Sequence, residues 1–183
     1  QTSFSDMVRI ANNVGAQAFI VVNYGSGTPQ EAAAWVRHAN ITNNLGYKYW
    51  EIGNECYGTW ETDTNALPNH AYTYALRASN YIAQMKAVDP TIKIGVVAVP
   101  GENSYANGYT DHPTINPRTG QTNYGWTPIL LKTLKSLGVT PDYLEVRQWE
   151  FASGRPFDAT DMAGATKVCL IGQTLVRELF HGR

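Results

Sequence analysis

The pattern of apolar and polar residues alternates between short apolar runs and stretches with helical periodicity. Residues 18–24, 48–53 and 92–99 form apolar runs rich in β-branched and aromatic residues, and a fourth run follows at residues 142–146. The first run has no polar alternation, which is typical of parallel strands buried on both faces. We therefore predict four strands of one parallel sheet.

The segments between these runs have the periodicity and the end signals of helices. Ser3 and Gly15 bracket the first helix, and Thr28 with Glu31 has the spacing of a capping box at the start of the second. We predict helices over residues 3–15, 28 to about 43, 69–88 and 127–138. Residues 102–125 are rich in Asn, Tyr, Thr, Gly and Pro, and connections of this length commonly carry function.

Four strands alternating with helices predict an α/β fold with right-handed crossovers. A closed eight-stranded (β/α)8 barrel typically needs about 250 residues, whereas this chain has 183. We therefore expect either a partial TIM-type barrel of about four βα units or an open doubly wound domain. Residues 1–150 are assigned to this domain, and residues 151–183 to a C-terminal tail with a helix-like apolar spacing. A partial barrel exposes two sheet edges, so we expect self-association.

Charge and composition exclude several classes of partner. Fourteen Lys and Arg against 15 Asp and Glu give a formal charge of −1, which argues against nucleic acids and anionic membranes as partners. No apolar run reaches the roughly 18 residues that span a bilayer, and the first residues lack the pattern of a signal peptide. Cys56 and Cys169 allow at most one disulfide, and no His pair has metal-ligand spacing. We expect no metal and no cofactor.

The segment at residues 49–60 carries the strongest candidate chemistry. Asn54 and Glu55 stand where the second predicted strand ends, the face that holds the active site in βα barrels. We expect Trp50, Tyr57 and Trp60 to flank the Glu55 carboxyl and shield it in part from water, and such desolvation raises a carboxyl pKa toward that of a general acid. Aromatic rings also offer faces on which sugars stack, and an amide such as Asn54 can bind a sugar hydroxyl. The pattern favours glycoside hydrolysis.

The run Trp50-Glu51-Ile52-Gly53-Asn54-Glu55, preceded by residues 29–36, resembles the clan A retaining glycoside hydrolases. The resemblance is strongest to the α-L-arabinofuranosidase-like enzymes and the neighbouring bacterial endoglucanases (cellulases) and xylanases, and it covers roughly residues 4–146. It implies that the four strands correspond to barrel strands three to six, that Glu55 is the general acid/base, and that Asn54 binds the sugar 2-hydroxyl. It also implies a plant cell-wall oligo- or polysaccharide as substrate and an extracellular or periplasmic location. The further candidate substrate-binding residues are Tyr24, Tyr57, Trp60 and Trp149.

A retaining mechanism needs a second carboxyl about 5–5.5 Å from the first. In the family that the chain resembles, this second carboxyl is a Glu at the end of barrel strand seven. No strand of that kind follows Val146. Glu102 and Glu150 stand just beyond the third and fourth predicted strands. Either could be the nucleophile of a retaining enzyme. At a carboxyl separation of about 6.5–9.5 Å from Glu55, either could instead be the general base of an inverting enzyme. The family uses neither position. We therefore expect this chain alone to hydrolyse very slowly or not at all.

Two other functions are compatible with the sequence. The chain could be a catalytically inactive carbohydrate-binding or structural barrel fragment that keeps the aromatic platform. Glu55 could also be an ordinary strand-end carboxylate that pairs with a Lys. It could also be a nucleotide-binding α/β domain with phosphate at residues 25–28, although a plain turn is favoured because no P-loop Lys follows.

Several residues have simpler structural interpretations. Trp50 is expected to pack in the core, and Cys56 to be a small apolar filler without a lowered pKa. His38 and His70 are expected to face solvent from helices, and His112 to belong to the polar long loop. Residues 40–42 form a glycosylation sequon, meaningful only in a eukaryotic secretory setting.

Overall fold

The computed structural model describes residues 3–139, which form an α/β fold. Its elements are, in chain order, α1 (Phe4–Val14), β1 (Phe19–Val22), α2 (Pro29–Val36), the π-helical turn η1 (Arg37–Thr42), β2 (Tyr49–Ile52), α3 (Ala71–Val88), β3 (Lys93–Val96), β4 (Thr114–Ile115), β5 (Thr122–Asn123) and α4 (Trp126–Ser136). Several predictions fall outside the described residues: the strand at residues 142–146, the domain boundary at residue 150, the roles of Trp149 and Glu150, and the tail at residues 151–183.

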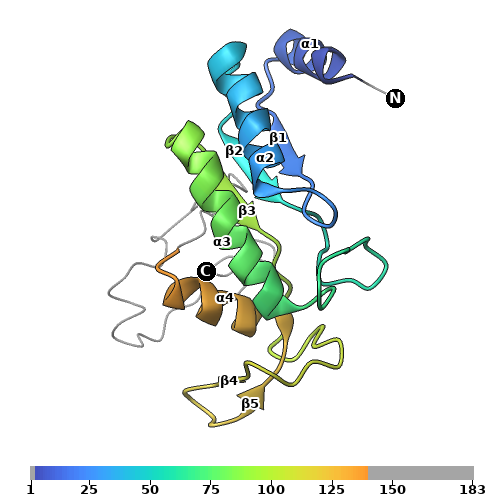
Figure 1. Cartoon of the computed structure of the whole chain (residues 1–183), viewed down its shortest axis with the longest axis vertical. Coiled ribbons are helices and arrows are strands. Elements are labelled where there is room, and N and C mark those ends of the chain that lie inside the picture. Colours follow the sequence, from blue (N-terminus) through green and yellow to red (C-terminus); the bar gives the residue numbers. More distant parts are fainter. Residues whose placement is uncertain (1–2, 140–183) are drawn as a thin grey trace, which may run out of the picture. The chain divides into compact units, whose positions relative to one another are not determined.

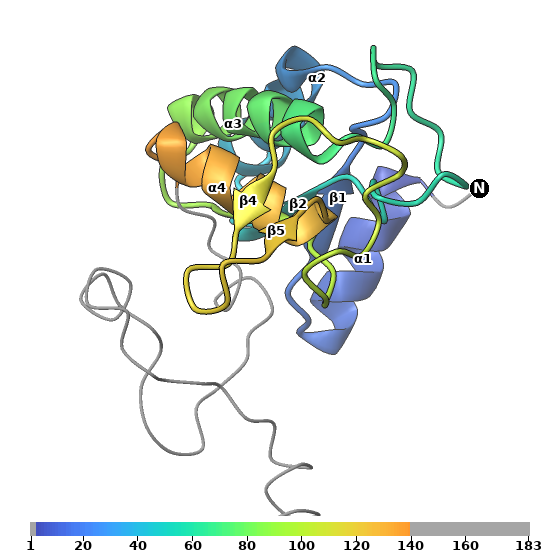
Figure 2. The same ribbon diagram turned by 90° about the horizontal axis from the view of Figure 1, so that it is seen from below.

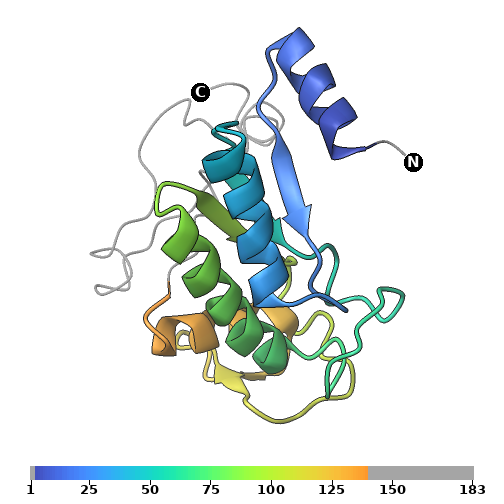
Figure 3. The ribbon, with the colours of Figure 1, turned by 45° about the horizontal axis from the view of Figure 1, so that its top comes forward.

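A parallel sheet of three strands in the order β1-β2-β3 forms the centre of the described part, as predicted. α2 and α3 lie side by side over one face of this sheet (Figures 1 and 3). The alternate strand residues at two levels of the register are at most 5% exposed and belong to the hydrophobic core: Ile20, Trp50 and Ile94, then Val22, Ile52 and Val96. Burial of these apolar side chains between sheet and helices stabilises the layer.

Strand β1 is not buried on both faces, and that prediction was wrong. Phe19 and Val21 are 40% and 42% exposed, whereas Ile20 and Val22 are buried. Among the described residues β1 pairs with β2 alone and forms the edge of the sheet. Phe19 and Val21 point to the sheet face opposite that of Ile20 and Val22, and the composition of a strand does not reveal whether that face is covered.

The helix ends follow the predicted capping signals. The Ser3 side chain accepts a hydrogen bond from the Asp6 N–H, and Gly15 ends α1 in the left-handed region at φ 65°. At the start of α2, Thr28 and Glu31 form the predicted reciprocal capping box. The second predicted helix reached about residue 43, and the structure differs in that α2 ends at Val36 and the chain continues as the wider turn η1.

Asn40 in η1 is an anchor between three elements. Its Nδ2 donates to the Tyr47 carbonyl at 2.9 Å and to Asp89 Oδ2 at 2.8 Å, and its Oδ1 accepts from the Tyr47 N–H at 2.8 Å. Both ends of the amide are therefore engaged in linking η1 to the segments before β2 and after α3.

The loops that follow the parallel strands gather at one end of the sheet (Figure 1). The loop after β3 contains the antiparallel pair β4–β5, which the sequence did not predict, and this pair lies with α4 at that end (Figure 2). α4 packs against α3, and its buried Trp126 donates through Nε1 to the Val97 carbonyl at 2.8 Å. Within residues 3–139, no helix has both the length and the apolar character needed to cross a membrane.

Candidate functional site

A sharp turn directly after β2 positions Glu55. Gly53 has φ 73°, and a side chain there would overlap Cys56 Sγ and approach Tyr24 Cβ to 2.9 Å. Glu55 itself has φ 43°, a left-handed conformation that costs a non-glycine residue about 1–2 kcal/mol. Such backbone conformations persist where the surroundings enforce them and concentrate at functional sites.

Two aromatic side chains hold the Glu55 carboxylate. Trp60 Nε1 donates to Oε2 at 2.8 Å, and the Tyr57 hydroxyl donates to Oε1 at 3.4 Å. Glu55 is exposed, so the prediction that these rings shield it from water was wrong. The two rings donate hydrogen bonds to the carboxylate and leave it accessible. Partial burial, and then the nearby Glu55 charge, raise the pKa of Tyr57, which keeps its hydroxyl proton available as a donor.

The Trp60 indole lies across Gly58, where a Cβ would overlap the ring. The indole is 60% exposed. One side of the ring is thus supported by the backbone while much of it remains accessible, as a stacking surface for a sugar requires.

Asn54, the neighbour of Glu55, is exposed and donates through Nδ2 to Glu61 Oε1 at 3.4 Å. The sequence did not point to Glu61, because nothing in the spacing ties a loop carboxylate to Asn54, seven residues before it. Asn54 and Glu61 both line a cavity of about 300 Å³ at the ends of β1 and β2. The cavity is lined by Val21, Val22, Asn23, Tyr24, Gly25, Ser26, Gly53, Asn54, Cys56, Glu61, Thr62, Asp63 and Asn69.

Tyr24 lines this cavity from the buried side. It is 2% exposed, and its ring packs 4.8 Å from the ring of Tyr74. Its hydroxyl has no hydrogen-bond partner among residues 3–139, and burial raises its pKa well above the usual value. The structure therefore gives Tyr24 a place in the wall of the cavity, behind the accessible surface.

The turn at residues 25–27 is packed against the chain. A Cβ on Gly25 would overlap the Thr62 carbonyl, and both the N–H and the hydroxyl of Thr64 donate to the Gly25 carbonyl at 2.8 Å. The Glu31 carboxylate accepts from the Thr28 N–H at 2.7 Å and brings a negative charge to the start of α2. That charge opposes phosphate at this helix end, so the plain-turn interpretation fits the geometry.

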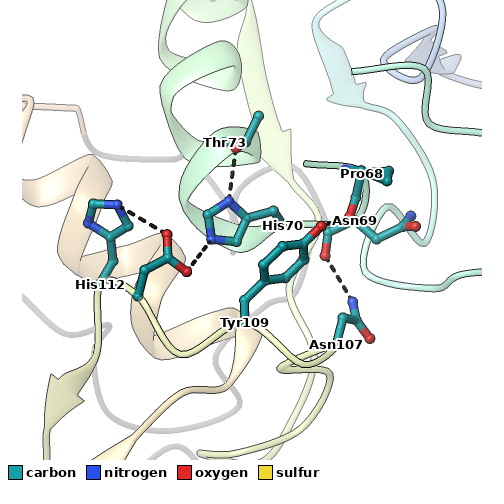
Figure 4. A network of polar contacts seen from close by, with 8 residues as sticks. Pro68, Asn69, His70, Thr73, Asn107, Tyr109 and His112 are labelled. Atoms are coloured by element: carbon teal, nitrogen blue, oxygen red, sulfur yellow. Dashed lines mark hydrogen bonds and ion pairs between the residues drawn. The ribbon is translucent and has the colours of Figure 1, made fainter. Parts of the chain in front are cut away.

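His70 is 2% exposed, so the prediction that it faces solvent was wrong. Its Nδ1 lies 2.9 Å from Thr73 Oγ1, and its Nε2 lies 3.1 Å from Asp111 Oδ1 (Figure 4). His112 lies 3.4 Å from the other oxygen of Asp111, while His38 is exposed as predicted. Within the described part, no group of three His, Cys, Asp or Glu could hold a metal ion.

Two structural predictions are confirmed beside the site. Trp50 is fully buried and donates through Nε1 to the Tyr47 carbonyl at 2.9 Å. Cys56 is buried, and desolvation raises the pKa of its thiol to about 12, which leaves it a neutral filler.

Glu102, one predicted partner of Glu55, belongs to a different hollow. Its carboxylate accepts from Asn116 Nδ2 at 2.7 Å and from Asn123 Nδ2 at 3.0 Å. It lines a groove of about 690 Å³ along the β4–β5 pair, whereas Asn54 lines the cavity at the strand ends. The other predicted partner, Glu150, lies outside the described residues.

The family model of the MacB-like periplasmic core domain matches residues 18–183. The chain belongs to this family. One similar protein is the macrolide export ATP-binding/permease protein MacB of Syntrophobacter fumaroxidans, 51% identical over 45 residues, which cover 25% of this chain and 6% of that protein. No motif in the sequence predicted this MacB-like membership.

This MacB-like chain is also similar to arabinofuranosidases. α-L-Arabinofuranosidase C of Emericella nidulans is 28% identical over 119 residues, covering 57% of this chain and 23% of the enzyme. The probable α-L-arabinofuranosidase C of Aspergillus clavatus is 28% identical over 107 residues, covering 50% and 20%. The crystal structure of the Thermotoga maritima α-L-arabinofuranosidase with arabinose is 29% identical with a TM-score of 0.48, covering 54% and 23%. The chain spans less than a quarter of the length of these relatives, and the arabinofuranosidase resemblance holds over about half of it.

Proposed function

We propose that residues 3–139 are the acid/base part of an arabinofuranosidase-type glycoside hydrolase, built as part of a βα barrel. The observation that carries this proposal is the Glu55 carboxylate: exposed, at the end of a parallel strand, in a left-handed turn, and held by Trp60 Nε1 at 2.8 Å. The order β1-β2-β3 with α2 and α3 on one face fits a section of a barrel wall. The similarity to arabinofuranosidases supports the proposal.

In the proposed reaction Glu55 donates a proton to the glycosidic oxygen as the bond to the sugar breaks. Asn54 binds the sugar 2-hydroxyl, and Trp60 supports an adjoining sugar. The substrate is a plant cell-wall polysaccharide, arabinose-bearing or β-1,4-linked, with neither nucleic acid nor membrane as partner. We place the reaction outside the cytoplasm, an expectation that the description of the family as periplasmic supports.

We do not assign the second carboxyl of the proposed reaction to Glu102, whose carboxylate is bound by Asn116 and Asn123 and lines a separate groove. Glu61 is the described carboxylate joined to the same strand end, through Asn54 Nδ2. Because Glu61 is bound by Asn54, the neighbour of Glu55, we do not assign it as the second carboxyl. The arabinofuranosidases that the chain resembles are more than four times longer than its span on them, so we propose that the nucleophile comes from the remainder of a barrel and that this chain alone turns over slowly.

The test is the hydrolysis of nitrophenyl α-L-arabinofuranoside and nitrophenyl β-D-xyloside at high protein concentration. Loss of a general acid lowers rates by roughly 10²–10⁴, so Glu55→Gln should abolish the slow turnover. Asp6→Asn, an equally conservative change of an exposed carboxylate on α1, should leave it unchanged. Equal turnover by wild type and Glu55→Gln would contradict the proposal.

Membership of the MacB-like family favours a second candidate, a domain without hydrolytic activity. It predicts no turnover of either glycoside and no effect of Glu55→Gln. Saccharide binding without turnover would identify an inactive carbohydrate-binding fragment, and neither binding nor turnover would favour a purely structural domain.

A further inference from the structure

Three aromatic rings from two loops meet beside Glu55. Tyr57 and Trp60 belong to the loop after β2, and Tyr105 belongs to the long loop after β3. The Tyr105 ring lies 4.5 Å from the ring of Tyr57 and 6.1 Å from that of Trp60, and the Tyr57 and Trp60 rings are 6.0 Å apart. Tyr57 and Trp60 were predicted from the sequence as substrate-binding residues, and Tyr105, 45 positions after Trp60, completes the cluster.

The two outer rings form an exposed corner. Trp60 is 60% and Tyr105 is 41% exposed, and their planes meet at 76°. Tyr57, which is half-buried, supports both from behind. Neighbouring exposed aromatic rings with a rigid support are typical of binding surfaces.

The segment that carries Tyr105 is fixed at several points (Figure 4). Asn107 Nδ2 donates to the carbonyls of Tyr57 and Asn69, each at 2.8 Å, and Tyr109 donates through its hydroxyl to the Pro68 carbonyl at 2.9 Å. Asp111, further along the loop, meets the buried His70 at 3.1 Å. Because the long loop is thus attached to the loop that carries Glu55, Tyr105 is held in place before any ligand arrives.

The Glu55-bearing loop is held by the same set of contacts. Asn69 is 7% exposed, and its Nδ2 donates to the Cys56 carbonyl at 3.1 Å and to the Gly58 carbonyl at 2.9 Å. Asn107 takes the intervening carbonyl, that of Tyr57. Three successive carbonyls next to Glu55 are therefore bound by two asparagine side chains, which couples the position of the carboxylate to that of Tyr105.

We propose that Trp60 and Tyr105 form a saccharide-binding corner for the sugar on the leaving-group side of the bond that Glu55 protonates. Asn54 and Cys56 line the cavity at the strand ends, while the Glu55 carboxylate between them bonds to Trp60. In this proposal a glycosidic oxygen lies at Glu55, with the cavity on the side of the cleaved sugar and the corner on the side of the leaving group. The C–H faces of a pyranose or furanose ring match the aromatic faces of the corner. This inference rests on the proposed function and adds Tyr105 to its substrate-binding residues.

The experiment is a titration of the whole chain with xylotetraose and with linear arabinotetraose, followed by amide chemical shifts. Wild type should bind at least one of the two, with shifts at Trp60 and Tyr105. Tyr105→Ala should weaken binding roughly three- to tenfold, the value of one aromatic stacking contact. Tyr105→Phe should bind as wild type does, and Tyr124→Ala, a tyrosine change in the same loop, is the matched control.

Unchanged affinity in Tyr105→Ala, or no binding of either tetrasaccharide, would overturn the inference. A matched loss in Tyr124→Ala would also overturn it, because the effect would then be a general one on the loop. The Glu55→Gln variant separates this result from the proposed function: it should lose turnover and still bind the tetrasaccharides. If no variant hydrolyses but binding depends on Tyr105, the corner stands and the hydrolase assignment fails.

Discussion

Glu55 combines an unfavourable backbone conformation with two directed hydrogen bonds. Its φ of 43° lies in the left-handed region, and Trp60 and Tyr57 hold the carboxylate by hydrogen bonds. A carboxylate oriented by its neighbours loses less side-chain entropy when a substrate binds. We propose that this orientation prepares the residue for contact with a ligand. The turn that carries it is crowded at Gly53, where a Cβ would overlap Cys56 Sγ.

Gly53→Ala tests this crowding. Alanine would be strained at φ 73°, and its Cβ would overlap Cys56 Sγ, so the free energy of unfolding should fall by about 3 kcal/mol. Gly46→Ala is the matched control, because Gly46 has φ 64° and an open space where its Cβ would stand; it should cost about 1 kcal/mol. Urea unfolding measures both, and equal losses would show that packing around Gly53 is not tight.

Cys56 makes stability depend on pH in alkaline solution. Burial raises the pKa of its thiol from 9.0 to about 12, so the unfolded chain releases this proton at a lower pH than the folded chain. The contribution of the buried neutral thiol to the free energy of unfolding is fully present below pH 9 and is lost as the pH rises toward 12. Between pH 8 and 10 the unfolding free energy of wild type should therefore fall relative to that of Cys56→Ala, at up to about 1.4 kcal/mol per pH unit. A constant difference would contradict the burial of the thiol.

At the scale of elements, local signals were predictable and long-range neighbours were not. Ser3, Gly15 and the Thr28–Glu31 capping box act within a few residues of themselves, and the structure confirms them. The buried state of His70 depends on Asp111, which stands 41 residues later. Strands β4 and β5 have two residues each, too short for any periodicity.

The candidate site divides in the same way. Asn54, Glu55 and Trp60 are within eight residues of the end of β2, and a strand followed by a turn of this composition pointed to them. Tyr105 and Glu61 joined the site only through the folded loops. Tertiary contacts between loops leave no period in the sequence, so these residues could not have been predicted from it.

The turn η1 is expected to depend on Asn40. Asn40→Ala removes three hydrogen bonds, one of them to the Asp89 carboxylate, and should lower the unfolding free energy by about 2–3 kcal/mol. The exposed Asn43, which donates through Nδ2 to the His38 carbonyl at 2.7 Å, is the control, and Asn43→Ala should cost less than about 1 kcal/mol. Thermal unfolding of the two variants compares them, and a reversed order would show that Asn40 is not the anchor.

At the scale of the whole molecule, two similarities meet in one chain. The MacB-like family model matches residues 18–183, whereas the arabinofuranosidases match about half the chain and contribute less than a quarter of their own length. The Glu55 site and its aromatic corner both lie in residues 3–139. A function for this part can therefore be tested on residues that the structure describes.

The exposed side of β1 predicts self-association. Phe19 and Val21 are 40% and 42% exposed on an edge strand, and such edges favour pairing with another chain. Light scattering should detect oligomers of the wild type, and Val21→Lys should reduce their amount. Ile115→Lys changes a 68% exposed residue of β4 and should leave the amount of oligomer unchanged. A monodisperse wild-type monomer that binds no hydrophobic dye would contradict this prediction.

The most direct test of the account is the dependence of hydrolysis on the leaving group. Wild type and Glu55→Gln would be compared on aryl α-L-arabinofuranosides whose phenols range from strongly to weakly acidic. A general acid matters most when the leaving oxygen is basic, so Glu55→Gln should lose roughly 10²–10⁴ in rate on the phenyl glycoside and far less on the dinitrophenyl glycoside. Equal losses across the series would contradict the assignment of Glu55 as the general acid.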